Sequence, residues 1–452
     1  MSVLFKDAVQ WSEAERMKAL KRIVSARAIR SVLQRTRRGL RPCRRLPRWF
    51  VVWFVIAMGW FSRDNYCQVF RWLQRRNAQR GVPGRSTLCE ARHSIGAAPL
   101  RLLAEEVIQL QAQPETPQCF YGGMRLMALD SFVLDVADTP RNERAFGRPG
   151  GGRAPGAFPQ ARVLSLCEVG THVLWRSLIK PCARAEVPMA GCLLRFLEEN
   201  MLLLWDRGFL SYALVRQVVA RKAYLLARLK SHMVFVPVKR LSDGSYLAYL
   251  YRSSWERKQD RNGILVRIIE YSLNDPARPG TGEKHRLMTT LLDARQHPAK
   301  RLIVLYHERW EEELAFDELK THLRERPVLR SGTPAGVVQE IYGLLLSHFV
   351  VRKLMCEAAA LNSLAPRQLS FVNTLKILRC RLPECPRAPV GLQNWYQNLL
   401  EEIAEQQLPP RRNRINPRVI KRKMSRWLKK RSKHRNYPQP KKTFRASIAM
   451  LN

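Results

Sequence analysis

The sequence predicts an α/β protein in which a mixed sheet is flanked by helices, with a helical N-terminal region and a β-rich insertion. Two observations predict this class. Apolar residues recur every three or four positions over the first 112 residues or so, and afterwards short apolar runs alternate with amphipathic segments. With 452 residues and 46% hydrophobic side chains, the chain can bury at least one large core.

The N-terminal segment, residues 1–115, is expected to be a helical domain. Its longest apolar run, Trp49 to Phe61, has 13 residues, fewer than the roughly 17 that a helix needs to cross a bilayer. We therefore expect a buried helix and no membrane partner. Charged residues interrupt the apolar positions at the start of the chain, which argues against a secretory signal and for a cytoplasmic location.

The next segment, residues 120–230, carries the first part of the core. A short buried strand at 125–129 is expected to end at Asp130, and a Gly- and Pro-rich loop follows at 147–159. The further elements expected are strands at 162–169 and 171–179, a helix at 186–200, a strand at 201–205 that ends at Asp206, a helix at 211–222 and a strand at 223–230. This order is that of the ribonuclease-H-like fold.

Three further segments complete the chain. Residues 231–300 consist of hairpin patterns, with strands expected at 233–239, 246–251, 263–271 and 284–292, and form a β insertion. Residues 301–408 should complete the core with helices near 302–325, 335–358, 366–380 and 391–407. Residues 409–452 form a basic tail.

The net charge of the chain indicates which class of molecule it binds. The chain has 79 Lys and Arg against 37 Asp and Glu, a net charge of +42. Residues 16–48 hold 13 basic and no acidic residues, and residues 411–445 hold 16 and none. Because so much like charge is self-repulsive without a polyanion, nucleic acid is the expected partner, bound through phosphate contacts and with steep salt dependence.

A polar stripe is expected on the helix at 302–325. Tyr306, Arg309, Glu313 and Lys320 lie at offsets of 0, 3, 7 and 14 residues, which at about 100° per residue place them on one narrow face. An adjoining apolar side, which would pack on the sheet, is formed by Phe316, Leu319 and Leu323. The alternative is a ladder of ion pairs, because Arg309 and Glu313 are four residues apart.

Three carboxylates are candidate metal ligands. Asp130 and Asp206 each follow a very apolar strand, where a lone acid is costly unless it meets a cation or the sheet edge. With Glu313 they would provide oxygen ligands for two Mg²⁺ or Mn²⁺ ions, which can activate water and stabilise an in-line displacement at phosphorus. The alternative for either Asp is a helix cap. Asp135 would be the substitute for Asp130.

Basic and hydrogen-bonding side chains around these acids are candidate DNA contacts. Neighbouring phosphates would be bound by Tyr306, Arg309 and Lys320. The guanidinium of Arg309 would donate paired hydrogen bonds, and the ammonium of Lys320 would act as a point charge. Arg207 either reaches a phosphate or pairs with the adjacent Asp206. Asp138 and Asn142 are candidates for positioning the loop that follows the first Asp.

These residues resemble a known family. The segment YHERWEEELAFDELK contains Tyr-x2-Arg-x3-Glu-x6-Lys, the YREK signature of the insertion-sequence-four family of bacterial DDE transposases. The segments LDSFVLDVADTPRNERAFG and LLLWDRGFLS resemble the family's first-Asp and second-Asp blocks, and the similarity runs from about residue 40 to about 400. One departure is Ser131, where the family frequently has Gly.

The resemblance implies an enzyme that cleaves DNA at the ends of a mobile element and joins the freed 3′-OH ends to target DNA. Asp130, Asp206 and Glu313 would be the metal-binding catalytic triad, and Tyr306, Arg309 and Lys320 would contact the DNA ends. Double-stranded DNA, as terminal inverted repeats and as target, is the implied partner, and residues 1–115 would be the DNA-binding domain that binds the element ends. Since two ends must be processed, a homodimer on DNA is expected, at the bacterial nucleoid.

Three other functions are compatible with parts of the sequence. The first is a non-catalytic DNA-binding regulator derived from a transposase, although binding alone would not require the three acids. The second is a DDE-type nuclease that cleaves without joining. The third is a structural nucleic-acid binder, which would leave the Tyr/Arg/Glu/Lys stripe unexplained.

Overall fold

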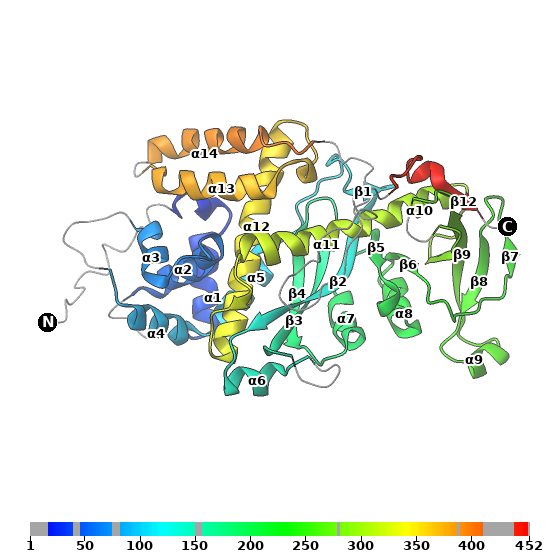
Figure 1. The fold of residues 1–452 in the computed structure, drawn as a ribbon, viewed down its shortest axis with the longest axis horizontal. Coiled ribbons are helices and arrows are strands. Elements are labelled where there is room, and N and C mark those ends of the chain that lie inside the picture. Colours follow the sequence, from blue (N-terminus) through cyan, green and yellow to red (C-terminus); the bar gives the residue numbers. More distant parts are fainter. Residues whose placement is uncertain are drawn as a thin grey trace. The chain divides into compact units, whose positions relative to one another are not determined.

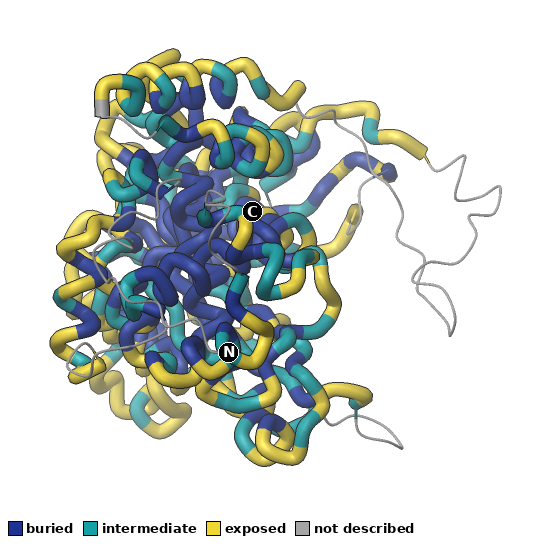
Figure 2. The backbone as a smooth tube through the Cα atoms, turned by 90° about the vertical axis from the view of Figure 1, so that its left-hand side faces the viewer, coloured by how far each residue is buried: buried dark blue, intermediate teal, exposed yellow. Residues whose placement is uncertain are grey.

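A computed structural model describes residues 17–38, 46–74, 82–149, 156–277, 281–386, 389–409 and 438–450 (Figure 1). The chain forms two compact units, Met1–Met201 with Trp310–Leu408, and Leu202–Arg309 with Pro409–Asn452. Buried segments lie inside the structure and exposed turns lie outside (Figure 2). Most of the second basic stretch, residues 410–437, lies outside the described residues. The five segments expected from the sequence remain a prediction.

The helical N-terminal expectation is confirmed for the described residues. The helices are α1 (Ala26–Arg35), α2 (Arg48–Trp60), α3 (Tyr66–Leu73), α4 (Arg85–Ile95) and α5 (Ala98–Val107). The side chain of Ser25 caps α1 and that of Asn65 caps α3, each accepting a backbone hydrogen bond that the helix start would otherwise lack. Helix α2 is buried along most of its length, as its apolar run predicts. No helix among the described residues is both long and apolar enough to span a bilayer.

Helix α2 packs closely against the long helix α12 (Pro334–Leu361). A Cβ added at Gly343 would lie 2.8 Å from Cγ1 and 2.9 Å from the carbonyl oxygen of Val55, and one added at Gly59 would overlap Oγ of Ser347. Ser347 donates its hydroxyl to the carbonyl of Ile56 at 2.5 Å. The two helices therefore approach each other at positions where one of them has no side chain.

Gly343→Ala is expected to lower the free energy of unfolding by about 1–3 kcal/mol, because the added methyl meets backbone that cannot move without separating the helices. Denaturant unfolding would measure the change. Gly208→Ala is the control, since a Cβ there meets no atom within 4 Å. Equal unfolding midpoints for the two variants would contradict the close packing.

The sheet of the first unit is built around β2 (Met124–Val136). Strands β3 (Gln160–Glu168) and β4 (Val173–Pro181) follow as an antiparallel hairpin, with β3 next to β2. The short strands β1 (Phe120–Tyr121) and β11 (Val328–Leu329) also pair with β2, antiparallel and parallel respectively. The hairpin expected at 162–179 is confirmed. Helices α6 (Pro140–Phe146) and α7 (Glu186–Leu194) belong to this unit, and α7 ends earlier than the helix expected at 186–200.

The prediction that the first core strand ends at Asp130 is wrong. Strand β2 continues to Val136, and Asp130 lies in its interior opposite Ser165 of β3. Beyond Asp130 the side chains alternate, with Phe132 buried and Val133 38% exposed. The change from a fully apolar run to an alternating one marks a change of environment along a single strand, not its end.

The second unit contains a mixed sheet. Strand β5 (Met201–Trp205) lies parallel to β6 (Tyr224–Arg228), and α8 (Tyr212–Ala220) connects them as predicted. The insertion follows with β10 (His285–Thr289), β9 (Ile264–Leu273), β8 (Tyr246–Leu250) and β7 (Lys239–Arg240), joined in that order by antiparallel pairing. Along the chain, β2-β3-β4-α7-β5-α8-β6 is the ribonuclease-H-like order that the sequence predicts.

Two details of the insertion differ from expectation, although its β-rich character is confirmed. Of the strand expected at 233–239 only its last residue is paired, in β7. A helix, α9 (Ser254–Lys258), was not predicted. Near the end of the chain, β12 (Ile448–Met450) pairs antiparallel with β9, so residues 438–450 of the predicted basic tail include a strand of this sheet.

The prediction of one regular helix at 302–325 is wrong. The segment consists of α10 (Ala299–Tyr306), a 3₁₀ turn (His307–Arg309), α11 (Trp310–Asp317) and a π-helical stretch (Glu318–Leu323). A 3₁₀ turn has three residues per turn and a π-helix more than an α-helix, so a constant 100° step does not hold across the segment. The predicted apolar side is nevertheless buried at Phe316, Leu319 and Leu323. The remaining helices are α12, α13 (Phe371–Arg381) and α14 (Pro389–Ala404).

Candidate active site

Asp130 and Glu313 lie on the same packed interface of the first unit. Phe132 of β2 and Phe316 of α11 have ring centroids 4.6 Å apart. Asp130 shares a strand face with Phe132, two residues on, and Glu313 shares a helix side with Phe316, three residues on. Both carboxylates are half-buried. The β2–α11 contact therefore places two of the three predicted metal ligands on one side of the sheet.

On the opposite face of β2, one side chain contacts the start of α7. Ser131 donates its hydroxyl to Glu186 at the start of α7, and Arg162 of β3 pairs with the same carboxylate. Asp130 accepts the backbone N–H of Ser131 at 2.7 Å. Ser131, where the family frequently has Gly, thus connects strand and helix without leaving the extended backbone of β2.

Asp135, the substitute for Asp130, is five residues along β2 and so lies on the other face. Its carboxylate accepts a hydrogen bond from Gln160 at 2.8 Å. Asn142 is fully buried and its amide donates to the carbonyls of Ala137 and Ser331, each at 2.9 Å. Asn142 therefore fixes the chain that follows β2, in the manner expected for a residue that positions this loop.

Asp206 in the second unit directly follows β5, as predicted. Its carboxylate accepts the backbone N–H of Arg207 at 2.6 Å and caps a 3₁₀ turn, Arg207–Phe209. Asp206 therefore acts as a cap, as the alternative interpretation expected. Its half-buried carboxylate nevertheless retains further acceptor positions that a metal ion could use. Arg207 is exposed, and in the described part of the chain its guanidinium forms no ion pair with Asp206.

Tyr306, also in the second unit, ends α10. Its hydroxyl donates to the carbonyl oxygen of Trp205 at 3.2 Å, one residue before Asp206. Burial raises the pKa of the Tyr306 phenol well above its usual value, the Arg309 guanidinium opposes this and the Asp206 carboxylate adds to it. Arg309 ends the 3₁₀ turn and is half-buried.

Lys320 lies in the π-helical stretch of the first unit. Its Nζ is 5.8 Å from the ring centroid of Phe132, the residue that shares a strand face with Asp130. An ammonium over an aromatic face is held by the ring's quadrupole. Lys320 therefore lies on the side of β2 that carries Asp130.

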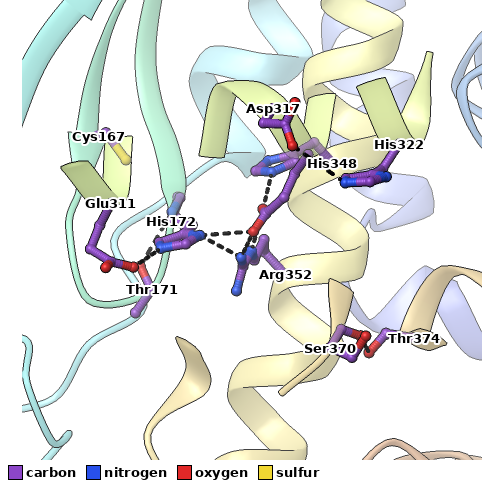
Figure 3. Close-up of polar contacts among 12 residues, drawn as sticks. Cys167, Thr171, His172, Glu311, Asp317, His322, His348, Arg352, Ser370 and Thr374 are labelled. Atoms are coloured by element: carbon purple, nitrogen blue, oxygen red, sulfur yellow. Dashed lines mark hydrogen bonds and ion pairs between the residues drawn. The ribbon is translucent and has the colours of Figure 1, made fainter. Parts of the chain in front are cut away.

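A buried polar cluster behind α11 was not predicted from the sequence (Figure 3). Arg352 of α12 and Glu318 form a two-point ion pair through Nε and Nη2 of the guanidinium. Nε2 of His348 lies 2.9 Å from Oε2 of Glu318. His172, in the turn between β3 and β4, lies 2.8 Å from Glu318 through Nδ1 and 2.9 Å from Glu311 through Nε2. The cluster connects α11, its π-helical continuation, the β3–β4 turn and α12.

Both histidines of this cluster are neutral at physiological pH. Burial lowers the pKa of His172 to about 3, with the Arg352 charge as a further cause, and burial lowers the pKa of His348 to about 3. A neutral His172 can donate Nε2–H to Glu311 while Nδ1 accepts from Arg352. A sequence signal for this cluster was the pair His348 and Arg352, which lie four residues apart in a largely apolar stretch of α12.

The chemistry of the three carboxylates fits Mg²⁺ or Mn²⁺, which prefer oxygen ligands. Asp130 and Glu313 belong to one compact unit and Asp206 to the other. Among the described residues, no three or more His, Cys, Asp or Glu side chains are gathered as metal ligands.

Comparisons with known proteins identify the family. A family model described as the insertion element 4 transposase N-terminal matches residues 14–105, and one described as the transposase DDE domain matches residues 121–350. The transposase InsG for insertion sequence element IS4 of Escherichia coli (strain K12) is 28% identical over 390 residues, which cover 84% of this chain and 86% of that protein. A structure of the piggyBac transposase synaptic complex with hairpin DNA aligns with a TM-score of 0.46 and 12% identity over 86% of each chain. The DDE-domain model matches more than half of the residues of this chain. The chain therefore belongs to the DDE transposases, in the insertion-sequence-four family.

Proposed function

We propose that this transposase excises its element and inserts it elsewhere by metal-dependent hydrolysis and strand transfer, with Asp130, Asp206 and Glu313 holding two Mg²⁺ or Mn²⁺ ions. The observation that supports it best is the β2–α11 contact, which directs Asp130 and Glu313 to one interface. Bound divalent ions would lower the pKa of water and stabilise the oxygens of an in-line displacement.

The reaction has two steps at phosphorus. In the first, water attacks the phosphodiester at the element end: a P–O bond to the water oxygen forms as the bond from phosphorus to the 3′ oxygen breaks. One proton is released to solvent, the 3′ oxygen takes up the other and leaves as a 3′-OH, and a 5′-phosphate remains. In the second, that 3′-OH attacks a phosphodiester of target DNA, a new P–O bond forms and the target's own 3′ oxygen leaves. Both steps are displacements at a phosphodiester, so one carboxylate set can serve both.

The proposed contacts to DNA are Tyr306, Arg309, Lys320 and Arg207. Arg207 is exposed, and Arg309 and Lys320 are half-buried, with Lys320 on the Asp130 side of β2. The partner is double-stranded DNA, both as terminal inverted repeats and as target, bound by a homodimer at the nucleoid in the bacterial cytoplasm. A non-catalytic regulator is not favoured, because binding alone requires no carboxylates on the β2–α11 interface.

The proposal is tested with a labelled duplex carrying the repeats that flank the gene. We expect cleavage at the repeat boundary with Mg²⁺ or Mn²⁺, joining to a target plasmid, and no product with EDTA. Binding without cleavage under either metal would support the regulator instead. Cleavage without joining would support a nuclease.

Arg309→Ala is expected to weaken binding of the end duplex and to reduce the slope of log K against log salt concentration by about 1, because one phosphate contact is lost. Fluorescence anisotropy at several salt concentrations would measure this. Arg295→Ala, which removes another side chain of the second unit that carries the same charge, controls for the lost charge itself. An unchanged slope for Arg309→Ala would remove Arg309 from the DNA contacts.

A further inference from the structure

We propose that His172 is a positioning residue for Glu313: its buried ring holds α11 at one rotation about the helix axis and so sets the direction of the Glu313 carboxylate. This inference rests on the proposed function, in which Glu313 is a metal ligand. The Tyr/Arg/Glu/Lys motif does not include His172, which lies in the turn between β3 and β4 and belongs to the same unit as α11.

The backbone of His172 has a conformation that residues other than glycine rarely adopt. Its φ is 58°, in the left-handed region, where a Cβ is costly. Glycine would be the least costly residue here, but glycine has no side chain to make a contact. His172 is 3% exposed. Because left-handed residues persist where the surrounding structure holds them, and are concentrated at functional sites, this backbone indicates that the ring has a task.

The ring of His172 lies between Glu311 and Arg352 (Figure 3). Its Nε2 is 2.9 Å from Oε2 of Glu311, to which the neutral ring can donate its proton. Its Nδ1 accepts from Nη2 of Arg352, and the same guanidinium forms the two-point ion pair with Glu318. A continuous path of hydrogen bonds therefore runs from Glu311 through the β3–β4 turn and α12 to Glu318.

The contact with His172 lies on the side of α11 that faces away from Glu313. At about 100° per residue, Glu313 lies about 200° round the helix from Glu311. Phe316, whose ring contacts Phe132 of β2, lies within about 60° of Glu313 on the same scale. Helix α11 is therefore held by apolar rings on the Glu313 side and by hydrogen bonds on the opposite side. Because apolar contact is non-directional and hydrogen bonds depend on direction, the hydrogen bonds decide the rotation of the helix.

The ion pair of Glu318 holds the point at which the helix changes its pitch. The π-helical stretch begins at Glu318, directly after α11 and two residues before Lys320. Turns of π-helix are rare and frequently lie at functional sites. The same path of contacts therefore fixes the helical turns that carry Glu313 and the start of the stretch that carries Lys320.

His172→Asn tests the inference. Asparagine tolerates the left-handed backbone and its side-chain oxygen can accept from Arg352, but it has no atom in the place of Nε2. We expect the single-turnover cleavage rate at saturating DNA to fall about 10-fold, which is equivalent to about 1.4 kcal/mol, the size of one hydrogen bond. The Kd for the end duplex should stay within about twofold. The apparent Kd for Mn²⁺ in the protein–DNA complex, followed by electron paramagnetic resonance, should rise several-fold.

Two further variants separate positioning from a general loss of stability. In His172→Gln the amide nitrogen is as many bonds from Cα as Nε2 is in histidine, so it can donate to Glu311. We expect this variant to recover the cleavage rate and the Mn²⁺ affinity to within about threefold of wild type, although the left-handed backbone favours asparagine over glutamine. Gly343→Ala, which is expected to destabilise the same unit, should leave both quantities unchanged at a temperature at which the protein is folded.

Wild-type cleavage and Mn²⁺ affinity in His172→Asn would overturn the inference. So would an equal loss in Gly343→Ala, or a rate in His172→Gln as low as in His172→Asn, because either result would make the loss a matter of stability. If His172→Asn does not fold, Glu311→Leu removes the same contact from the side of the helix and is judged by the same outcomes. If His172→Asn weakens Mn²⁺ binding and His172→Gln restores it, while wild type never cleaves DNA, the proposed function alone is contradicted.

Discussion

Glu313→Gln is expected to bind the end duplex as wild type does and to cleave it at least about 10³-fold more slowly, because an amide cannot replace a charged metal ligand. The substitution keeps the shape of the side chain, so the packing of α11 on β2 should survive. Cleavage of labelled duplex under single-turnover conditions, with binding measured in parallel, would give both quantities.

Asp317→Asn is the matched control for this variant. Asp317 is four residues further along α11, with a side chain 52% exposed. Its Oδ1 accepts from Thr321, a bond that Asn can keep. We expect cleavage at the wild-type rate. If Glu313→Gln cleaves equally well, Glu313 does not hold the metal, and if it fails to bind DNA, the substitution has damaged the fold.

Glu318→Ala should lower the free energy of unfolding by about 3–5 kcal/mol, because the Arg352 charge would remain buried without its partner. Arg352 is 1% exposed and Glu318 is 8% exposed. His348 would also lose the acceptor of its Nε2–H. Denaturant unfolding at neutral pH, where both imidazoles are neutral, measures the loss.

Two further variants sharpen this prediction. Glu384→Ala removes one of the two carboxylate partners of Arg381, in an exposed pair, and should cost less than about 1 kcal/mol. Glu318→Leu combined with Arg352→Leu removes both charges, and should recover much of the lost stability. If the double variant is no more stable than Glu318→Ala, the loss of stability does not come from the unpaired charge of Arg352. It would then come from the loss of the interactions of the whole cluster.

Local patterns in the sequence were sufficient for most elements. The apolar run at 201–205 and the Asp after it predict β5 and its end, because a short, uniformly apolar run followed by a polar turn is typical of a buried strand. The same rule failed at Asp130. There the strand extends past the edge of the buried layer, and only its pairing with β3 shows that it continues.

For the candidate site too, the sequence predicts some features and not others. The carboxylates and the Tyr/Arg/Glu/Lys spacing could be read from the chain, because residue type and interval carry the chemistry. The His172–Glu318–Arg352 contacts could not, because they join residues 146 and 34 positions apart. The changes of helical pitch at 307–309 and 318–323 could not be predicted either, because the spacing of the polar residues is also compatible with a regular helix.

Strand β12 makes the fold depend on residues that lie far along the chain from the three carboxylates. Ile448 and Met450 stand opposite Leu273 and Tyr271 of β9, so a frameshift shortly before codon 448 would leave that stretch of β9 without its neighbour. Open strand edges favour pairing between chains. A gene copy with intact Asp and Glu codons could therefore still fail through a lesion in β12. Intactness of a copy should be judged over this strand as well as over the catalytic motif.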